Sequence, residues 1–366
     1  MNRAFNFSAG PATLPTEVLE TIQSELLDFQ GTGISVMEMS HRGKIFDAVY
    51  KESVANLRQL AAIPEDFDIL YMTGGASTQF ALAPINLAGP KTAKKAGYVN
   101  TGSWYEKTIK AAQTVGVEVF DAASSKGSNH NHIPKEIAGA SDLAYLHITS
   151  NNTIFGTQFQ SLPSAKESGD AKLVIDMSSD FLSKPIDWSN IGVAYAGTQK
   201  NAGPSGLTVV VIHRSLYERE SDETPAMFRY STFAKNDSMY NTPPTFQIYA
   251  FGLIVKWLLE KQGGLTGIAA HNEKKAKLIY DVIDGAPEFF KGHSVTDSRS
   301  LMNATWNFAN TDLNQVFLDG ANDRRLDGLK GHRSVGGLRA SIYNAMPAAG
   351  CAALAEYMKE FLKSNG

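Results

Sequence analysis

Two residues with complementary chemistry follow apolar segments of this chain. Lys200 lies in the segment Tyr195–Gly206, and Asp176 directly follows the apolar run Leu173–Ile175. Both preceding segments are typical of short buried strands, so each side chain would project from the end of a sheet, where open α/β folds bind ligands. A lysine there can form a Schiff base, and a carboxylate can keep a pyridine nitrogen protonated, which is what pyridoxal phosphate chemistry requires. A solvated loop lysine and a carboxylate that caps the next segment are the alternatives.

A glycine pair follows another predicted strand, which ends at Thr73. In Gly74–Phe80, small residues precede a helical stretch, so backbone N–H groups could close on a phosphate at the positive end of the helix dipole. The segment has neither the Gly-Lys-Ser/Thr ending of a Walker loop nor the three-glycine dinucleotide spacing. A plain turn is the alternative on this signal alone.

Alternating strands and helices would position these residues. Val18, Leu19, Ile22 and Leu26 have the spacing of an amphipathic helix over residues 16–30. Several helical or turn-rich segments separate the predicted strands, which favours an α/β fold with a mainly parallel sheet covered by helices. The predicted strands are Ile69–Met72, Gly97–Asn100, Val117–Phe120, Leu143–Ile148, Leu173–Ile175 and Leu207–Val211.

The length of 366 residues suggests two domains. An apolar helix is predicted over Phe246–Leu259, and the pair Gly263–Gly264 follows as the boundary. We expect a large domain of residues 16–262. Residues 1–15 and 263–366 would form a smaller α/β domain, with strands at Ala304–Phe308 and Leu338–Ile342 and a closing helix over residues 348–362.

Composition excludes several functional classes. The net charge of -3 and the lack of a basic block argue against a nucleic-acid partner. The N-terminus has no apolar signal core, and no apolar stretch is long enough to span a bilayer, so we expect a cytoplasmic protein without a membrane partner. One cysteine, Cys351, permits no intrachain disulfide and is interpreted as a packing residue. No Cys/His cluster has zinc spacing, and we expect no metal site.

Four ordered segments resemble one enzyme family. Tyr195–Gly206 is similar to the cofactor-lysine segment of the phosphoserine aminotransferase family, which consists of fold-type I pyridoxal phosphate enzymes. Phe5–Ala12, Ser35–Lys44 and Lys330–Pro347 resemble other segments of the same family. The resemblance extends over essentially the whole chain and implies a fold-type I transferase that binds pyridoxal 5'-phosphate.

The resemblance also implies roles for individual residues. Lys200 would form the Schiff base, and Asp176 would bind the pyridinium nitrogen. Trp104 would stack on the cofactor ring, although a half-buried core aromatic is the alternative. Thr153 would bind the phenolic oxygen, although it could be an ordinary turn residue. Further cofactor contacts would come from Ala76, Ser77, Gln199 and, from the neighbouring subunit of a homodimer with shared active sites, Asn241 and Thr242.

The implied substrate carries a carboxylate and a phosphate, which arginine side chains bind well. The family pattern assigns the carboxylate to Arg339. It assigns the phosphate to His41 and Arg42 and to His332 and Arg333, with the second pair reaching across the dimer. Outside the family pattern, two His-Arg pairs would be unremarkable on a solvated surface.

Ser77 departs from part of the family. Some members carry an arginine at this position, where it adds to the binding of the substrate phosphate. The residue present here puts in question how that phosphate is shared among the remaining cations.

The implied reaction is the reversible transamination of 3-phosphooxypyruvate with L-glutamate, which gives O-phospho-L-serine and 2-oxoglutarate for serine biosynthesis. Similar members also use 4-phosphohydroxy-L-threonine in vitamin B6 biosynthesis. A related fold-type I enzyme, such as an alanine–glyoxylate or serine-type aminotransferase, would share Lys200 and Asp176 but would not need the two His-Arg pairs. A non-catalytic phosphate or nucleotide binder would explain the Gly74–Gly75 turn but would leave Lys200 without a role.

Overall fold

A seven-stranded sheet forms the centre of the computed structural model, which describes residues 3–140 and 142–366. Its strand order is β2-β10-β9-β8-β5-β3-β4, and every neighbouring pair is parallel except the two that involve β10. The α/β fold with a mainly parallel sheet is therefore confirmed. The strands are β2 (Phe67–Met72), β3 (Lys95–Asn100), β4 (Glu118–Ser124), β5 (Leu146–Thr149), β8 (Leu173–Asp176), β9 (Ile191–Gly197) and β10 (Thr208–His213).

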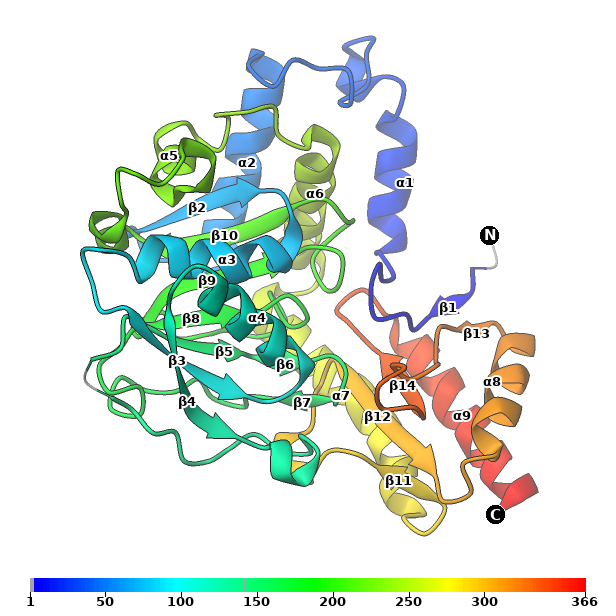
Figure 1. Ribbon diagram of the computed structural model, residues 1–366. Coiled ribbons are helices and arrows are strands. Elements are labelled where there is room, and N and C mark those ends of the chain that lie inside the picture. Colours follow the sequence, from blue (N-terminus) through cyan, green and yellow to red (C-terminus); the bar gives the residue numbers. More distant parts are fainter. Residues whose placement is uncertain (1–2, 141) are drawn as a thin grey trace.

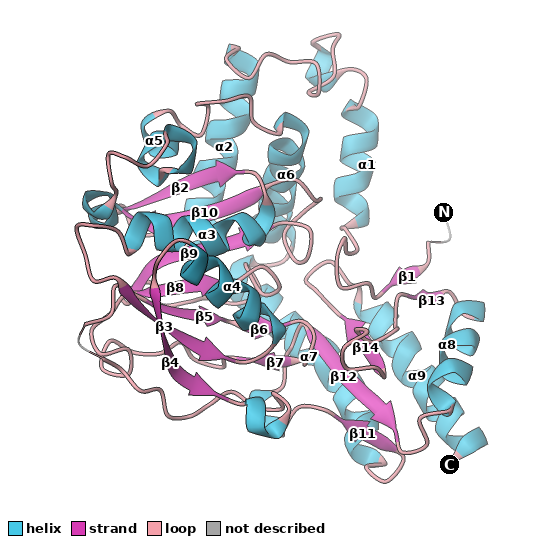
Figure 2. Cartoon of the chain, viewed as in Figure 1, coloured by secondary structure: helices cyan, strands magenta, loops and turns pink. Residues whose placement is uncertain are grey.

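Helices cover both faces of this sheet (Figures 1 and 2), and in Figure 1 helices α3 and α4 cross in front of it. Alternate residues of β10 show the two faces, because Val209 and Val211 belong to the core shared with α2 and α6, while Val210 and Ile212 belong to the core shared with α3 and α5. Burial on both faces explains why these strands are continuously apolar. The helices are α2 (Lys44–Ala61), α3 (Gly75–Leu87), α4 (Ser103–Thr114), α5 (Tyr230–Lys235) and α6 (Thr245–Lys261).

The C-terminal part of the chain builds a second apolar core around a three-stranded antiparallel sheet of order β11-β12-β14. The N-terminal strand β1 (Phe5–Asn6) joins this part by pairing in parallel with β13 (Leu326–Asp327). The other elements are α7 (Gly264–Gly285), β11 (Phe290–Gly292), β12 (Asn303–Phe308), α8 (Leu313–Asp323), β14 (Leu338–Ser341) and α9 (Ala348–Asn365), and a separate hairpin is formed by β6 (Asn151–Asn152) and β7 (Thr157–Gln158).

The domain boundary at Gly263–Gly264 stays a prediction. Helix α7 begins there but contributes to both cores: Leu265 and Ile268 pack with the large sheet's helices, whereas Ala276 and Ile279 pack in the C-terminal core. The first turns of this helix thus connect the two parts of the molecule.

The first helix is shorter than its apolar spacing predicts. Helix α1 ends at Glu25 rather than near Gln30. The side chain of Asp28 accepts a hydrogen bond from the N–H of Gly33 at 2.7 Å, and Asp28 itself has an extended backbone. This local bond competes with continuation of the helix.

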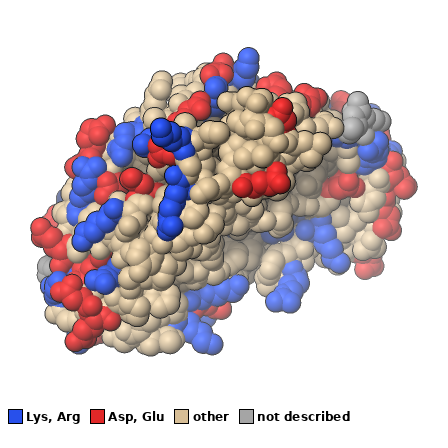
Figure 3. Space-filling view, turned by 90° about the horizontal axis from the view of Figure 1, so that it is seen from above, with Lys and Arg blue, Asp and Glu red and all other residues tan. Residues whose placement is uncertain are grey.

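The surface seen in Figure 3 carries basic and acidic side chains interspersed. Among the described residues, no helix combines the length and the apolar character that a membrane span needs.

Candidate active site

Asp176 is the last residue of β8, and its backbone lies between Thr149 of β5 and Tyr195 of β9. Its side chain is 5% exposed. The Oδ1 atom accepts hydrogen bonds from the N–H of Ser178 at 3.0 Å and from the hydroxyl of Ser178 at 2.7 Å. Ser178 also accepts a bond from the N–H of Gly197 at 3.1 Å, so it holds the ends of two strands together and fixes the orientation of the carboxylate.

Lys200 follows the neighbouring strand β9, as the sequence predicts. Its Nζ donates to Oγ1 of Thr153 at 2.8 Å and lies 5.0 Å from the centroid of the Trp104 ring. Desolvation lowers the pKa of Lys200; the negative charge of Asp176 opposes this effect, and the positive charge of Arg339 adds to it. A lower pKa increases the share of free amine, which is the nucleophilic form.

The N-terminal segment supports the lysine loop from outside. The N–H of Ala12 donates to the carbonyl oxygen of Gln199 at 3.0 Å. Gly10 has a φ of +150°, and a Cβ added there would lie 3.2 Å from Cγ of Lys200. Sequence reasoning used this segment only for the family resemblance and missed its contact with the lysine.

Trp104 stands in the first turn of α4. The helix begins after Gly102, where an added Cβ would collide with the side chains of Asn152 and Phe155. Asn152 donates to the carbonyl oxygen of Thr101 at 2.8 Å and accepts from the N–H of Phe155 at 3.2 Å. This amide therefore ties the start of α4 to the loop of Thr153, which sets the distance between the indole and the lysine.

The predicted phosphate loop begins helix α3. Gly74 has a φ of +90°, and a Cβ there would collide with the side chain of Thr78. Ala76 and Ser77 lie in the first turn, where N–H groups have no intrahelical acceptor and can bind an anion. Between Arg58 and Lys91 the sequence contains no lysine or arginine. The loop can therefore supply N–H donors and a helix dipole but no cationic side chain.

Arg339 on β14 reaches the same site. Its guanidinium donates to the carbonyl oxygen of Thr153 at 3.4 Å, and its buried Nε has no hydrogen-bond partner among the described residues. Desolvation lowers the pKa of Arg339. A partly buried guanidinium with an unused donor, next to the residue that binds Lys200, is suited to a substrate carboxylate.

His332 lies near Arg339 of its own chain. Desolvation lowers the pKa of His332, and the charges of Arg339, Arg333 and Lys107 lower it further. The expectation that His332 and Arg333 reach across a dimer stays a prediction.

His41 and Arg42 line a different cavity, of about 240 Å³. Its lining includes Met239, two residues before Asn241, and none of Lys200, Asp176, Trp104 or Arg339. Asn241 and Thr242 are exposed, and the buried Nε2 of His41 has no partner in the described part of the chain. Asn241 and Thr242 are expected to contribute to the cofactor site of the neighbouring subunit. Their segment therefore begins next to the cavity of His41 and Arg42.

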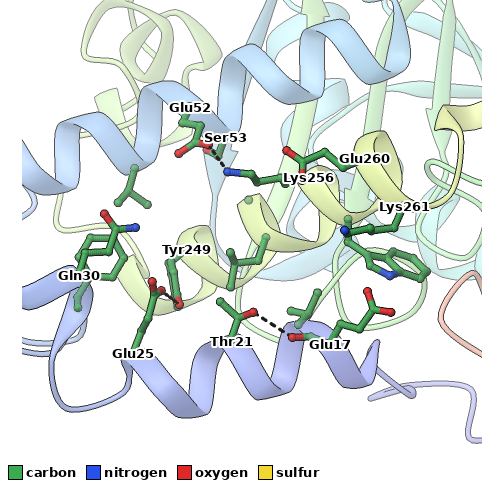
Figure 4. A pocket seen from close by; sticks show the side chains of 16 residues that line it. Glu17, Thr21, Glu25, Gln30, Glu52, Ser53, Tyr249, Lys256, Glu260 and Lys261 are labelled. Atoms are coloured by element: carbon green, nitrogen blue, oxygen red, sulfur yellow. Dashed lines mark hydrogen bonds and ion pairs between the residues drawn. The ribbon is translucent and has the colours of Figure 1, made fainter.

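Figure 4 shows another cavity, of about 310 Å³, which is lined by residues of α1, α2 and α6. Two interactions cross it: Lys256 donates to Glu52 at 3.2 Å, and the Tyr249 hydroxyl donates to Glu25. None of the predicted site residues lines this cavity.

Comparison with known proteins identifies the family of this chain. Residues 4–354 match the family described as aminotransferase class V. A phosphoserine aminotransferase of Desulfatibacillum aliphaticivorans is 52% identical over 100% of this chain and 99% of the relative, and one of Lysinibacillus sphaericus is 50% identical over 99% of both. The chain belongs to the class V aminotransferases, within the phosphoserine aminotransferase family. The enzyme class expected from the sequence is confirmed.

Solved structures share the fold of this aminotransferase. The phosphoserine aminotransferase from Bacillus circulans subsp. alkalophilus has a TM-score of 0.95 and 48% identity, covering 100% of this chain and 99% of that one. The pyridoxal phosphate-bound enzyme from Trichomonas vaginalis has a TM-score of 0.92 and 40% identity, covering 98% and 100%. An alanine–glyoxylate aminotransferase from Nostoc is 16% identical with a TM-score of 0.73, a likeness of fold alone. The expected fold-type I architecture is confirmed.

Proposed function

We propose that this aminotransferase exchanges the amino group of L-glutamate for the oxo group of 3-phosphooxypyruvate, giving O-phospho-L-serine and 2-oxoglutarate. Family membership over the whole chain supports this reaction. The observation that carries it is the placement of Lys200, whose Nζ lies 2.8 Å from Thr153 while Arg339 donates to the carbonyl oxygen of the same threonine. The Lys200 amine and the Arg339 guanidinium, which would bind a carboxylate, thus both contact Thr153.

The residues present fit pyridoxal phosphate, and the expectation of this cofactor is confirmed by the family. Asp176 presents Oδ2, which has no hydrogen-bond partner among the described residues, while Oδ1 is held by Ser178. This oxygen would hold the pyridinium nitrogen. The N–H groups of Ala76 and Ser77, with Gln199, would hold the phosphate.

Lys200 would take the proton from the substrate Cα. Bound pyridoxal phosphate supplies the electron sink for the charge that develops at the substrate Cα. Desolvation favours the neutral amine of Lys200, which is the form that takes the proton from Cα. Thr153 holds Nζ in position over the Trp104 ring before the proton moves. Asp176 would hold the protonated pyridine nitrogen of the cofactor.

Arg339 would bind the α-carboxylate that all the amino- and oxo-acid substrates share. His332 and Arg333, in the loop that precedes β14, would bind the phosphate. The side-chain carboxylate of glutamate would use part of the same set of cations. Arg339 would thus bind the end that all the substrates share, and the other cations would bind the end at which the substrates differ in charge.

The enzyme would act as a homodimer with shared sites. His41 and Arg42 lie near the segment of Asn241 and Thr242 and apart from their own Lys200, which supports delivery of both segments to the partner subunit. We therefore propose that His41 and Arg42, rather than His332 and Arg333, cross the dimer.

Mixed dimers test the shared site. Lys200→Ala and Arg42→Ala homodimers should both turn over O-phospho-L-serine poorly. In a mixed dimer, one site combines an intact Lys200 with an intact Arg42, so random mixing should restore about a quarter of wild-type activity. No recovery on mixing, with dimer exchange shown by tagged subunits, would contradict the shared site.

A cytoplasmic location is also proposed, as expected from the sequence. The use of 4-phosphohydroxy-L-threonine in vitamin B6 synthesis is proposed on the family resemblance. Assay of that compound in place of O-phospho-L-serine tests the second.

The reaction itself is tested by a coupled assay with glutamate and 3-phosphooxypyruvate, recorded with the visible spectrum. We expect parallel initial-rate lines, since the amino group is held by the enzyme between two half-reactions. Faster turnover of L-serine than of O-phospho-L-serine would favour a serine-type aminotransferase. Purified protein that shows no cofactor absorbance after incubation with pyridoxal phosphate would favour a non-catalytic binder.

A further inference from the structure

Lys107 is a cation of the active site that neither the motifs nor the family resemblance singled out. It lies one turn after Trp104 on α4, and residues three apart share a helix face. Its Nζ lies 4.6 Å from the centroid of the Trp104 ring, over which Nζ of Lys200 also lies, at 5.0 Å. Both ammonium groups therefore contact the same indole.

Lys107 has no carboxylate partner. Among the described residues it makes no hydrogen bond and no ion pair, and its side chain is exposed. Other surface lysines of the chain, such as Lys51 and Lys277, are paired with a carboxylate four residues away. The positive charge of Lys107 is thus available to an incoming anion.

His332 and Arg333 lie in the loop that precedes β14, the strand of Arg339. The charge of Lys107 acts on the His332 ring together with the charges of Arg333 and Arg339. His332 and Arg333 belong to the C-terminal part of the chain, whereas Lys107 belongs to a helix of the large sheet. An anion between them would be held from both parts of the molecule.

The phosphate loop increases the need for such a cation. Ser77 is neutral, and no lysine or arginine stands between Arg58 and Lys91, so this face of the site has no cationic side chain from α3. A phosphate at the distal end of the substrate carries nearly two negative charges, whereas the side chain of glutamate carries one. A single cation placed there discriminates between the two by charge.

We propose that Lys107 binds the phosphate of the substrate together with His332 and Arg333 and sets the preference for phosphorylated over unphosphorylated amino acids. This inference rests on the proposed function. Arg339 binds the carboxylate common to both classes of substrate, so it cannot supply this preference.

The test compares Lys107→Met with Lys110→Met in the holoenzyme. Methionine keeps an apolar stem against Trp104 and removes the charge. Lys110 is the matched control, because it is an exposed lysine of the same helix and contributes no charge to His332. We expect Lys107→Met to lower kcat/KM for O-phospho-L-serine about tenfold and for L-glutamate about threefold or less, because charged contacts to a dianion exceed those to a monoanion. Lys107→Arg should restore most of the loss.

A binding measurement separates the inference from the reaction. Calorimetric titration of the holoenzyme with inorganic phosphate should show weaker binding in Lys107→Met and unchanged binding in Lys110→Met. An equal loss for both amino acids in Lys107→Met, or a shifted cofactor absorbance, would reduce Lys107 to a support for Trp104 and overturn the inference. Unchanged kinetics and unchanged phosphate binding would overturn it as well. Wild-type protein that fails to turn over O-phospho-L-serine contradicts the proposed function instead.

Discussion

The hydroxyl of Thr153 accepts a hydrogen bond from Nζ of Lys200 at 2.8 Å, and the carbonyl oxygen of the same threonine accepts one from Arg339. One residue thus sets the position of the Lys200 amine relative to the Arg339 guanidinium. Positioning of this kind contributes to catalysis because the reacting groups are held in place before the reaction.

Thr153→Val should lower kcat about tenfold, since Lys200 loses its acceptor while the side-chain volume is kept. Thr153→Ser keeps the hydroxyl and should retain most of the activity. Single-turnover absorbance changes with O-phospho-L-serine measure both variants. Equal rates in the valine and serine variants would show that the hydroxyl does not position the lysine.

Lys200→Ala should abolish turnover, because no other amine stands at the end of β9. The visible absorbance of the bound cofactor should change at the same time, since the Schiff base is lost. Lys110→Ala serves as the control for a lost surface lysine. A Lys200→Ala protein with wild-type absorbance and turnover would remove the lysine from the mechanism.

Arg339→Lys should raise KM for O-phospho-L-serine and for L-glutamate by similar factors, roughly a hundredfold, because the planar fork that binds a carboxylate is lost. Steady-state kinetics with each amino acid measure this. The symmetry distinguishes Arg339 from Lys107, whose replacement should affect the phosphorylated substrate more. An effect on O-phospho-L-serine alone would move Arg339 to the phosphate.

Gly102→Ala should lower the free energy of unfolding by roughly 2 kcal/mol or more, since the new Cβ would meet Asn152 and Phe155 at a φ of +145°. Gly127→Ala is the matched control, because nothing lies within 4 Å of its added Cβ. Urea denaturation of the two variants measures the difference. Comparable stability would mean that the start of α4 can shift away from the lysine site.

Lys275 provides a prediction about pH. It is fully buried and donates to the carbonyl oxygens of Ile342 and Tyr343 at 3.0 and 2.7 Å, and desolvation lowers its pKa to about 8. In the unfolded chain this lysine has its ordinary pKa of about 10.4, so above pH 8 the unfolded state binds more protons than the folded state. The free energy of unfolding should therefore rise from about pH 8 to about pH 10.4, and Lys275 should not affect its pH dependence below that range. Lys275→Met should lack this rise. Denaturation of both proteins over that pH range measures the difference, and parallel curves would contradict it.

The sequence predicted the parts of the site that local patterns encode. Asp176 and Lys200 follow apolar strand segments, and the turn at Gly74 precedes a helix. Contacts between distant segments were not predictable, because neither the hydrogen bond from Ala12 to Gln199 nor the one from Arg339 to Thr153 leaves a periodic signal. Lys107 was missed for another reason, since a single lysine on an exposed helix face has no distinguishing pattern.

The pairing of β1 with β13 bears on how the enzyme is made. Phe5 and Asn6 are translated long before their strand partners Leu326 and Asp327. Until then, the large sheet can fold while the segment that supports the lysine loop through Ala12 lacks its anchor. Lys200 therefore reaches its final setting only after β13 has been translated.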